Sequence, residues 1–487
     1  MRKPYGKQCR FDCTPIAELS LNFECRDEII PILAALQYVY LNESLRTKTT
    51  KLIARDLNLD TRRDVGRSGL DDWQVIVLAA VRLGCNLDYD KLQDLAENHR
   101  SLRCLLGVGD WDDSTSFSFR RIRDTLCQLK PQTLHKINHA IASSGQDIHG
   151  QARKEVRADS FVVETNIHHP SESTLIFDGV RKIIPLCVSL ATQLGQPGWR
   201  QSKHLTRAIK KRVRVISQIV ASKSPRAKAA LPNAYANLLS RVALLIERAE
   251  SLQSLAETKG HTKELWTQVA ALKHWIELIR VVCDTAYRRV LLKEKVPSSE
   301  KLFSLFEPHT QLYCRGKAMT PNQFGRLLLI FEDGAGFISH YHLMDRDAQD
   351  PDVMIEQMRQ AQKLHHGEIE SASLDRGFYT PQNEEQLSTI VAHPCLPPRH
   401  RNQYAERMAN SSVEFRRARM RHSGVESAIG SLQRGNGLKR CRDRSELGME
   451  RYIGLAILGR NLHVLGKLLI ARCNGEAAAG RSERLAA

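Results

Sequence analysis

The stretch IESASLDRGFYTPQNEEQL, residues 369–387, contains a short apolar run, a turn and a segment with helical character. The apolar run ends at Asp375, and Arg376-Gly377 follows it as a tight exit. Aspartate is common where a strand enters a turn, because its side chain bonds nearby backbone groups. In open α/β sheets, however, functional groups gather at the ends of strands. The elements around this stretch decide whether Asp375 is a turn residue or a ligand.

Segments with the periodicity of strands and helices alternate on both sides of this stretch. In order, they are a strand (residues 153–170), a hairpin around EDGAG (324–344), a helix (350–365), the strand before Asp375, a helix from about 381, a strand (389–396) and long late helices. This order predicts an α/β domain with a mixed sheet over residues 151–190 and 311–470.

Two other regions have helical periodicity only. Residues 1–150 predict a small all-helical domain with an arginine-rich helix, for which DNA binding and dimerisation fit equally well. Residues 191–310 contain long amphipathic segments that should pack as an antiparallel bundle, inserted into the α/β domain. Residues 471–487 are low in apolar bulk and are expected to form a disordered tail.

The charge of the chain points to a polyanionic partner. Lysine and arginine number 72 against 54 acidic residues, which gives a net charge of +18. The basic excess falls in specific arginine-rich segments, so nucleic acid is the first candidate and a generally basic soluble protein is the alternative.

The cysteine and hydropathy patterns indicate a soluble protein of the cytoplasm. Twelve cysteines are scattered singly without a C-x-x-C pair, which disfavours a structural zinc site and suits a reducing compartment. The charged N-terminus lacks the apolar core of a signal peptide. The apolar stretch 452–470 is broken by Arg460 and Lys467, so we do not expect it to span a membrane.

Three acidic residues occupy distinctive places in the predicted α/β domain. Asp159 lies in its first strand, Asp375 ends a later strand, and Glu426 lies near the start of a late helix. Each has a simpler interpretation alone: an exposed strand position, a turn, and an S-x-x-E capping box formed by Ser423 and Glu426. Together, three converging carboxylates would bind two Mg²⁺ or Mn²⁺ ions, which suits phosphodiester chemistry.

Four blocks in this order resemble those of DDE transposases from bacterial insertion sequences. The blocks are RADSFVVETNIHHPSESTL, RGKAMTPNQFGRLLLIFEDGAGFI, SASLDRGFYTPQNEEQL and RHSGVESAIGSLQRGNGLKRCRDR with the following GMERYIGLAILGRNLHVLG. They cover much of residues 153–466, and residues 71–108 resemble the helical N-terminal region of the same family.

The resemblance implies a ribonuclease H-like catalytic core in which Asp159, Asp375 and Glu426 form the catalytic, metal-binding triad. It also implies Mg²⁺-dependent cleavage and strand transfer at transposon ends. Some relatives carry a tyrosine, an arginine and a lysine at set offsets on the glutamate helix. This chain has Arg419, His422 and Gln433 in that neighbourhood, so the pattern is not kept.

Two basic clusters are the candidate DNA contacts, because phosphate binding needs a dense positive face. The candidates are Arg200, Lys203, Arg207, Lys210 and Lys211 in the insertion, and Arg416, Arg417, Arg419, Arg421, His422, Lys439, Arg440 and Arg442 beside the proposed catalytic helix.

The sequence therefore predicts a transposase that binds terminal inverted repeats on double-stranded DNA and cuts and joins them with Mg²⁺. We expect a homodimer or larger assembly on DNA, located with the nucleoid and not at a membrane. The alternative is a non-catalytic DNA-binding repressor or scaffold of transposase descent.

Overall fold

The computed structural model describes residues 13–57, 69–110, 112, 114–150, 152–259, 262–314 and 321–486, without the side chains of residues 401 and 475–486. The chain forms two compact units. The first comprises Met1–Glu164 and Arg326–Ala487, and the second comprises Thr165–Gly325. Residues 315–320, where the second resembling block begins, lie outside the described residues.

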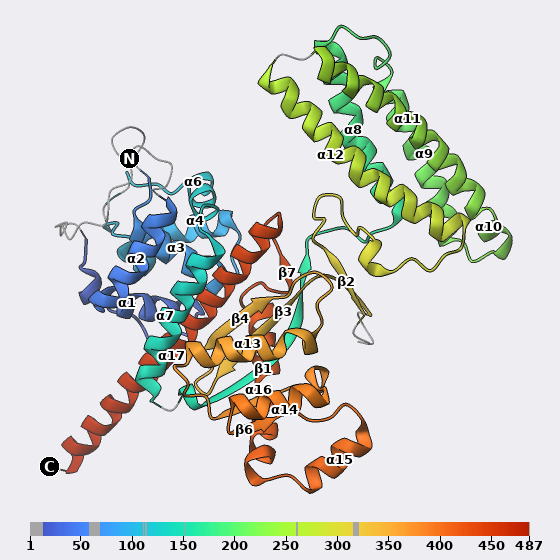
Figure 1. The fold of residues 1–487 in the computed structure, drawn as a ribbon. Coiled ribbons are helices and arrows are strands. Elements are labelled where there is room, and N and C mark those ends of the chain that lie inside the picture. The colour runs from blue at the N-terminus through green and yellow to red at the C-terminus, as the bar shows by residue number, and fades with distance from the viewer. Residues whose placement is uncertain are drawn as a thin grey trace. The chain divides into compact units, whose positions relative to one another are not determined.

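A mixed sheet of seven strands contains Asp159 and ends one of its strands just before Asp375 (Figure 1). Its strands are β1 (Glu155–Thr165), β2 (Gln311–Cys314), β3 (Asn322–Asp333), β4 (Ile338–Leu343), β5 (Ser371–Leu374), β6 (His393–Cys395) and β7 (Arg440–Cys441). The order is β2-β3-β1-β5-β6, with β4 paired to β3 and β7 paired to β1. β5 runs parallel to both β1 and β6, whereas β3 and β4 form an antiparallel hairpin. The predicted α/β class and mixed sheet are confirmed.

Helices cover this sheet and build the rest of the first unit. Before β1 come α1 (Ile29–Leu41), α2 (Glu43–Leu57), α3 (Asp72–Gly84), α4 (Tyr89–Asn98), α5 (Arg100–Leu105), α6 (Phe119–Leu126) and α7 (Pro131–His149). After the hairpin come α13 (Asp350–Leu364), α14 (Pro381–Ile390), α15 (Arg401–Ala409), α16 (Val413–Arg434) and α17 (Glu446–Ala486).

The helix α17 joins the N-terminal helices and the sheet into one hydrophobic core. It packs against α1, α3 and α7, as Figure 1 also shows. Gly459 of α17 faces Gly84 of α3, where a β-carbon on Gly459 would lie 2.4 Å from the Gly84 nitrogen. The buried cluster accordingly contains residues of α1, α3, α7, β1, β3 and α17. Residues 1–150 were predicted as a separate domain, but the described helices of this region share their core with the sheet.

The end of α17 and its apolar stretch bear on two expectations from the sequence, a disordered tail and the absence of a membrane span. The helix continues through Ala486, so the predicted disordered tail at 471–487 is helical as far as the structure describes it. Residues 446–474 are long and apolar enough to cross a membrane by length and composition, but the most apolar window is 61% buried within the structure. Its apolar residues serve the core of the first unit.

The second unit is a helical bundle with its own core. It contains α8 (Glu172–Gln193), α9 (Ser202–Ala221), α10 (Pro225–Ala229), α11 (Leu231–Lys259) and α12 (Lys263–Ala286), and β2 pairs with the first residues of β3 at Asn322–Gly325. The predicted insertion began at residue 191, but the compact unit begins at Thr165. Helix α8 packs on α9, α11 and α12, because its apolar face completes their core.

Candidate carboxylate site and basic surfaces

Asp159 of β1 and Asp375, the residue that follows β5, both come directly after the last register pair of these two parallel strands. The register pairs Glu155 with Ser371 and ends at Ala158 opposite Leu374, so the next residues along the two chains are Asp159 and Asp375. Neighbouring strands are about 4.8 Å apart, and successive side chains point to opposite faces. Ala158 and Leu374 are buried, whereas both aspartates are half-buried. The two carboxylates therefore emerge together on one face of the sheet.

The turn after β5 does not use the Asp375 carboxylate. Asp375 precedes a short 3-10 helix, Arg376–Phe378, and within the described part of the chain its side chain makes no capping hydrogen bond there. The backbone oxygen of Asp375 accepts from the Phe378 nitrogen at 3.1 Å instead. The interpretation of Asp375 as a side-chain turn residue is thus not supported. On β1, the Asp159 carboxylate accepts from the Ser160 backbone nitrogen at 2.7 Å.

Helix α16 is held across the sheet near these carboxylates. It packs against β5 and β6, and Ser412 caps its start by accepting from the Phe415 nitrogen at 3.2 Å. The Arg157 guanidinium on β1 donates to the Arg421 carbonyl at 3.0 Å. Gly424 permits this approach, since a β-carbon there would lie 2.1 Å from an Arg157 nitrogen.

His422 of α16 is buried beside Asp375 and does not lie on the basic surface. The side chain is only 5% exposed. Burial and then the charge of Arg419 lower its pKa to about 4, although Asp375 and the backbone of Ser373 act in the opposite direction. Its Nδ1 atom has no hydrogen-bond partner among the described residues. A neutral, buried imidazole is badly placed for a phosphate contact, so the predicted DNA-binding role of His422 fits the structure poorly.

Glu426 lies one helical turn after His422, in the middle of α16. Because the helix begins at Val413, the Ser423–Glu426 capping box considered from the sequence is wrong. Glu426 is exposed. Among the described residues, no group of three or more His, Cys, Asp or Glu side chains converges closely enough to hold a metal ion. The Asp159–Asp375 pair fits a hard cation by the chemistry of its oxygens, whereas Glu426 does not complete a three-ligand cluster.

The basic candidates fall into two groups by their neighbours. Arg416, Arg417 and Lys439 are exposed, as are Arg200, Lys203, Arg207, Lys210 and Lys211 along α9 and just before it in the second unit. The others have internal partners: Arg421 pairs with Glu155, Arg440 lies 3.6 Å from Glu164, and Arg442 donates to the Tyr452 hydroxyl at 2.9 Å. Arg419 is half-buried in α16.

The α9 candidates form a single stripe. Positions 203, 207, 210 and 214 repeat at three- and four-residue steps, which places them on one helix face. The opposite face buries Leu205, Ile209, Val213 and Ile216 in the bundle. Helix α9 contains no acidic residue, so no negative charge interrupts this stripe.

The sequence interpretation missed an ionic network on the same sheet. Arg157 donates to Glu332 of β3 at 2.5 Å, and Arg460 of α17 lies 3.7 Å from the other Glu332 oxygen. Burial raises the pKa of Glu332, and it raises the pKa of the next residue, Asp333, to about 7. The sequence feature that could have revealed this network is the acid pair Glu332-Asp333, which ends the apolar run LLLIFED.

A cavity of about 690 Å³ opens beside this network, at the amino ends of β1 and β5. Its lining includes Lys154, Arg157, Glu332, Glu370 and Arg417. It precedes Asp159 and Asp375 along both strands, so the cavity and the carboxylate pair are different features of the sheet.

Searches against protein-family models, curated proteins and solved structures find no match to this chain.

Proposed function

We propose that this chain is a DNA transposase of the DDE type, which cuts at the ends of its element and joins them to a target. The observation that carries the proposal is that Asp159 and Asp375 directly follow the last register pair of the parallel strands β1 and β5, despite more than 200 residues between them in sequence. Carboxylates that converge from distant segments beside a basic helix are expected of a phosphodiester-cleaving site. The position of β1 between an antiparallel hairpin and two parallel strands supports a ribonuclease H-like core.

We propose that the cofactor is a pair of divalent ions, either Mg²⁺ or Mn²⁺. Asp159 and Asp375 would hold the ions. Glu426 is the third ligand that the resemblance implies, and it would have to move toward the two aspartates to bind, because the three do not form a cluster in this structure. When bound, such ions neutralise charge on the phosphate and activate a water molecule.

The other residues would bind and orient DNA. Exposed Arg416 and Arg417 on α16 and the stripe on α9 would contact the phosphate backbone of double-stranded DNA. Arg157 would fix α16 against β1, and so the position of Glu426, through its bond to the Arg421 carbonyl. We further propose a homodimer or larger assembly that works on the nucleoid in the cytoplasm.

The triad is tested by Asp159→Ala, Asp375→Ala and Glu426→Ala in the full chain, with exposed Glu385→Ala as the matched control. The substrate is DNA from the flanks of the gene, assayed for nicking and joining with Mg²⁺ or Mn²⁺. We expect each triad variant to lose cleavage by at least about 100-fold and to retain DNA binding, since one essential charge-stabilising group is removed. Full cleavage by Asp375→Ala would refute the assignment.

The exposed position of Glu426 favours a second candidate, a non-catalytic DNA-binding repressor or scaffold. Such a protein would bind the flanking DNA but would neither nick it nor bind Mn²⁺ at the aspartates. A nuclease without strand transfer would nick DNA and give no joined product on a gel.

A further inference from the structure

A basic cleft lies between α2 and α7 in the first unit, far along the chain from the candidate DNA contacts. Its volume is about 410 Å³. The residues that line this α2–α7 cleft are Lys48, Lys51, Leu52, Arg55, His135, Lys136, His139 and Leu364. Four of these eight residues are lysine or arginine, and none is acidic.

Helical periodicity places the charges on one side of α2. Lys48, Lys51 and Arg55 are spaced three and four residues apart and are exposed. The opposite side of α2 is buried through Thr49 and Ile53. Helices α2 and α7 pack together, which brings Lys136 to the other wall of the cleft.

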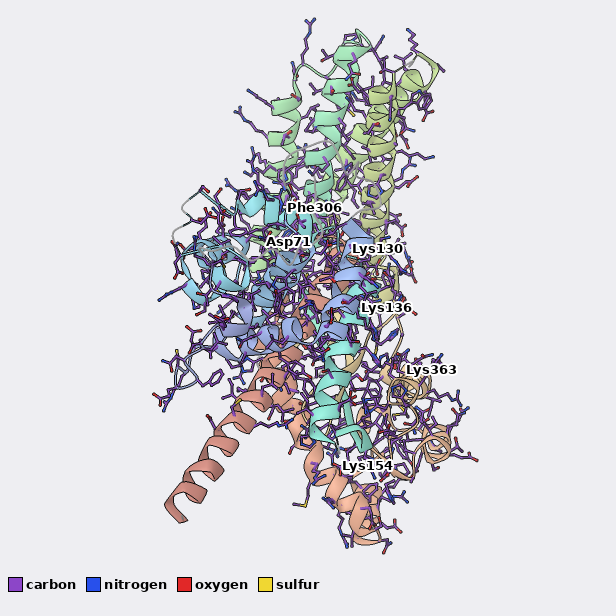
Figure 2. All side chains as sticks on the ribbon, turned by 90° about the vertical axis from the view of Figure 1, so that its left-hand side faces the viewer. Asp71, Lys130, Lys136, Lys154, Phe306 and Lys363 are labelled. Atoms are coloured by element: carbon purple, nitrogen blue, oxygen red, sulfur yellow. The ribbon has the colours of Figure 1, made fainter. Side chains whose placement is uncertain are left out.

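The acidic residue nearest in sequence, Asp56, is engaged elsewhere. It is buried, and its carboxylate accepts from the Lys130 backbone nitrogen at 2.8 Å, at the start of α7. Among the described residues, no acid forms an ion pair with Lys48, Lys51, Arg55 or Lys136. Lys136 and Lys363, the exposed residue before Leu364, are both labelled in Figure 2.

Like charges that surround a hollow repel one another, and an anion in the hollow relieves this cost. From Lys48 to Arg55 the helix rises about 10 Å, a length over which one strand of duplex DNA carries about three phosphates. Lysine suits such a contact because its flexible ammonium acts as a point charge.

We infer that the α2–α7 cleft binds the phosphate backbone of duplex DNA, as a contact separate from the basic residues of α9 and α16. The inference rests on the proposed function in one respect: the choice of DNA as the polyanion that the cleft binds. The contact is independent of base sequence, so it adds affinity and fixes the N-terminal helices on the DNA.

The test removes the cleft charges in the full chain. The cleft variant carries Lys48→Ala, Lys51→Ala, Arg55→Ala and Lys136→Ala. The control variant has the same net charge and carries Lys91→Ala, Lys259→Ala, Lys263→Ala and Lys273→Ala at exposed positions. Fluorescence anisotropy measures the Kd for duplexes of about 40 base pairs from the flanks of the gene, between about 50 and 200 mM salt.

We expect the cleft variant to bind at least about tenfold more weakly, with a log–log salt slope smaller by about three. A charge-preserving variant with Lys48→Arg, Lys51→Arg and Lys136→Arg should bind like wild type. Equal losses in the cleft and control variants, or an unchanged slope, would overturn the inference. Circular dichroism checks that each variant is folded.

Two further measurements keep the outcomes apart. If the cleft variant binds and cuts DNA like wild type, the inference fails while the proposed function stands. If the triad variants still cut DNA, the proposed function fails while the cleft contact is judged by the salt slope alone. A cleft-dependent affinity for polyglutamate but not for DNA would assign the cleft to an acidic protein segment and refute the inference.

Discussion

At the scale of single residues, His422 shows how a basic cluster can contain a core side chain. On α16 the buried residues Phe415, Ala418, His422 and Val425 recur at steps of three and four. The same periodicity is present in the sequence, but the four arginines just before His422 concealed it. The residue belongs to the buried stripe of the helix, next to Asp375.

Burial of His422 makes a pH dependence that can be measured. Its pKa falls from 6.5 in the unfolded chain to about 4 in the fold, so protonation favours unfolding. This contribution to stability is present above pH 6.5 and is lost as the pH falls toward 4. We expect His422→Gln to lose less stability than wild type between about pH 7.5 and pH 5, measured by urea unfolding.

The matched control for this prediction is His400→Gln, because His400 is exposed. Its pH dependence should equal that of wild type. If His422→Gln and wild type lost the same free energy of unfolding as the pH falls, His422 would not contribute to the pH dependence of stability. The folded His422→Gln protein should also bind DNA like wild type, in contrast to the role predicted from the sequence.

At the scale of elements, α16 depends on one glycine for its position over β1. A methyl group at Gly424 would collide with the Arg157 guanidinium, which Glu332 and the Arg421 carbonyl hold in place. Overpacking typically costs 1–3 kcal/mol, whereas replacing a helical glycine by alanine gains up to about 1 kcal/mol.

We therefore expect Gly424→Ala to destabilise the full chain by about 1 kcal/mol in urea unfolding. Gly430→Ala on the same helix is the control, since its β-carbon would meet only the mobile end of exposed Arg434. That variant should be neutral or slightly more stable. Greater stability of Gly424→Ala than of Gly430→Ala would contradict the role assigned to Arg157.

The order of elements could be predicted from periodicity, but their limits could not. The cap of helix α16 is Ser412, eleven residues before the Ser423 cap considered from the sequence, because arginines dominate the first turns and hide the apolar stripe. The parallel pairing of β1 with β5, which ends just before Asp159 and Asp375, also lay beyond the sequence. It is set by strand register between segments that the helical unit and the hairpin separate.

At the scale of the whole molecule, the limits of the compact units were the least predictable feature. Local patterns divide residues 1–150 from the sheet, yet their apolar faces meet α17, which is more than 300 residues away from α3. Helix α8 likewise follows β1 directly in sequence but belongs to the second core. Such long-range contacts leave no signal in a local window.

The shared core predicts opposite results for two truncations. A chain that ends after Ser445 lacks α17, whose buried Tyr452, Ile453, Leu455 and Leu458 alone represent several kcal/mol of apolar burial. That loss is comparable to the total stability of a domain, so we expect the first unit to lose fixed tertiary structure. A chain that ends after Asn474 keeps this core and should match the full chain in near-UV circular dichroism and thermal unfolding.

Should the chain that ends after Ser445 retain the near-UV spectrum and cooperative unfolding of the first unit, α17 would not be the element that completes it.

The late position of α17 also bears on how the protein is made. Helices α1 to α7 leave the ribosome long before their partner, since about 300 residues separate the end of α7 from the start of α17. At a translation rate of 5–20 residues per second, the apolar faces of these helices remain without α17 for about 15–60 s. We therefore expect the nascent N-terminal region to bind chaperones during each round of translation, and a chain that ends before α17 to be degraded faster than the full chain.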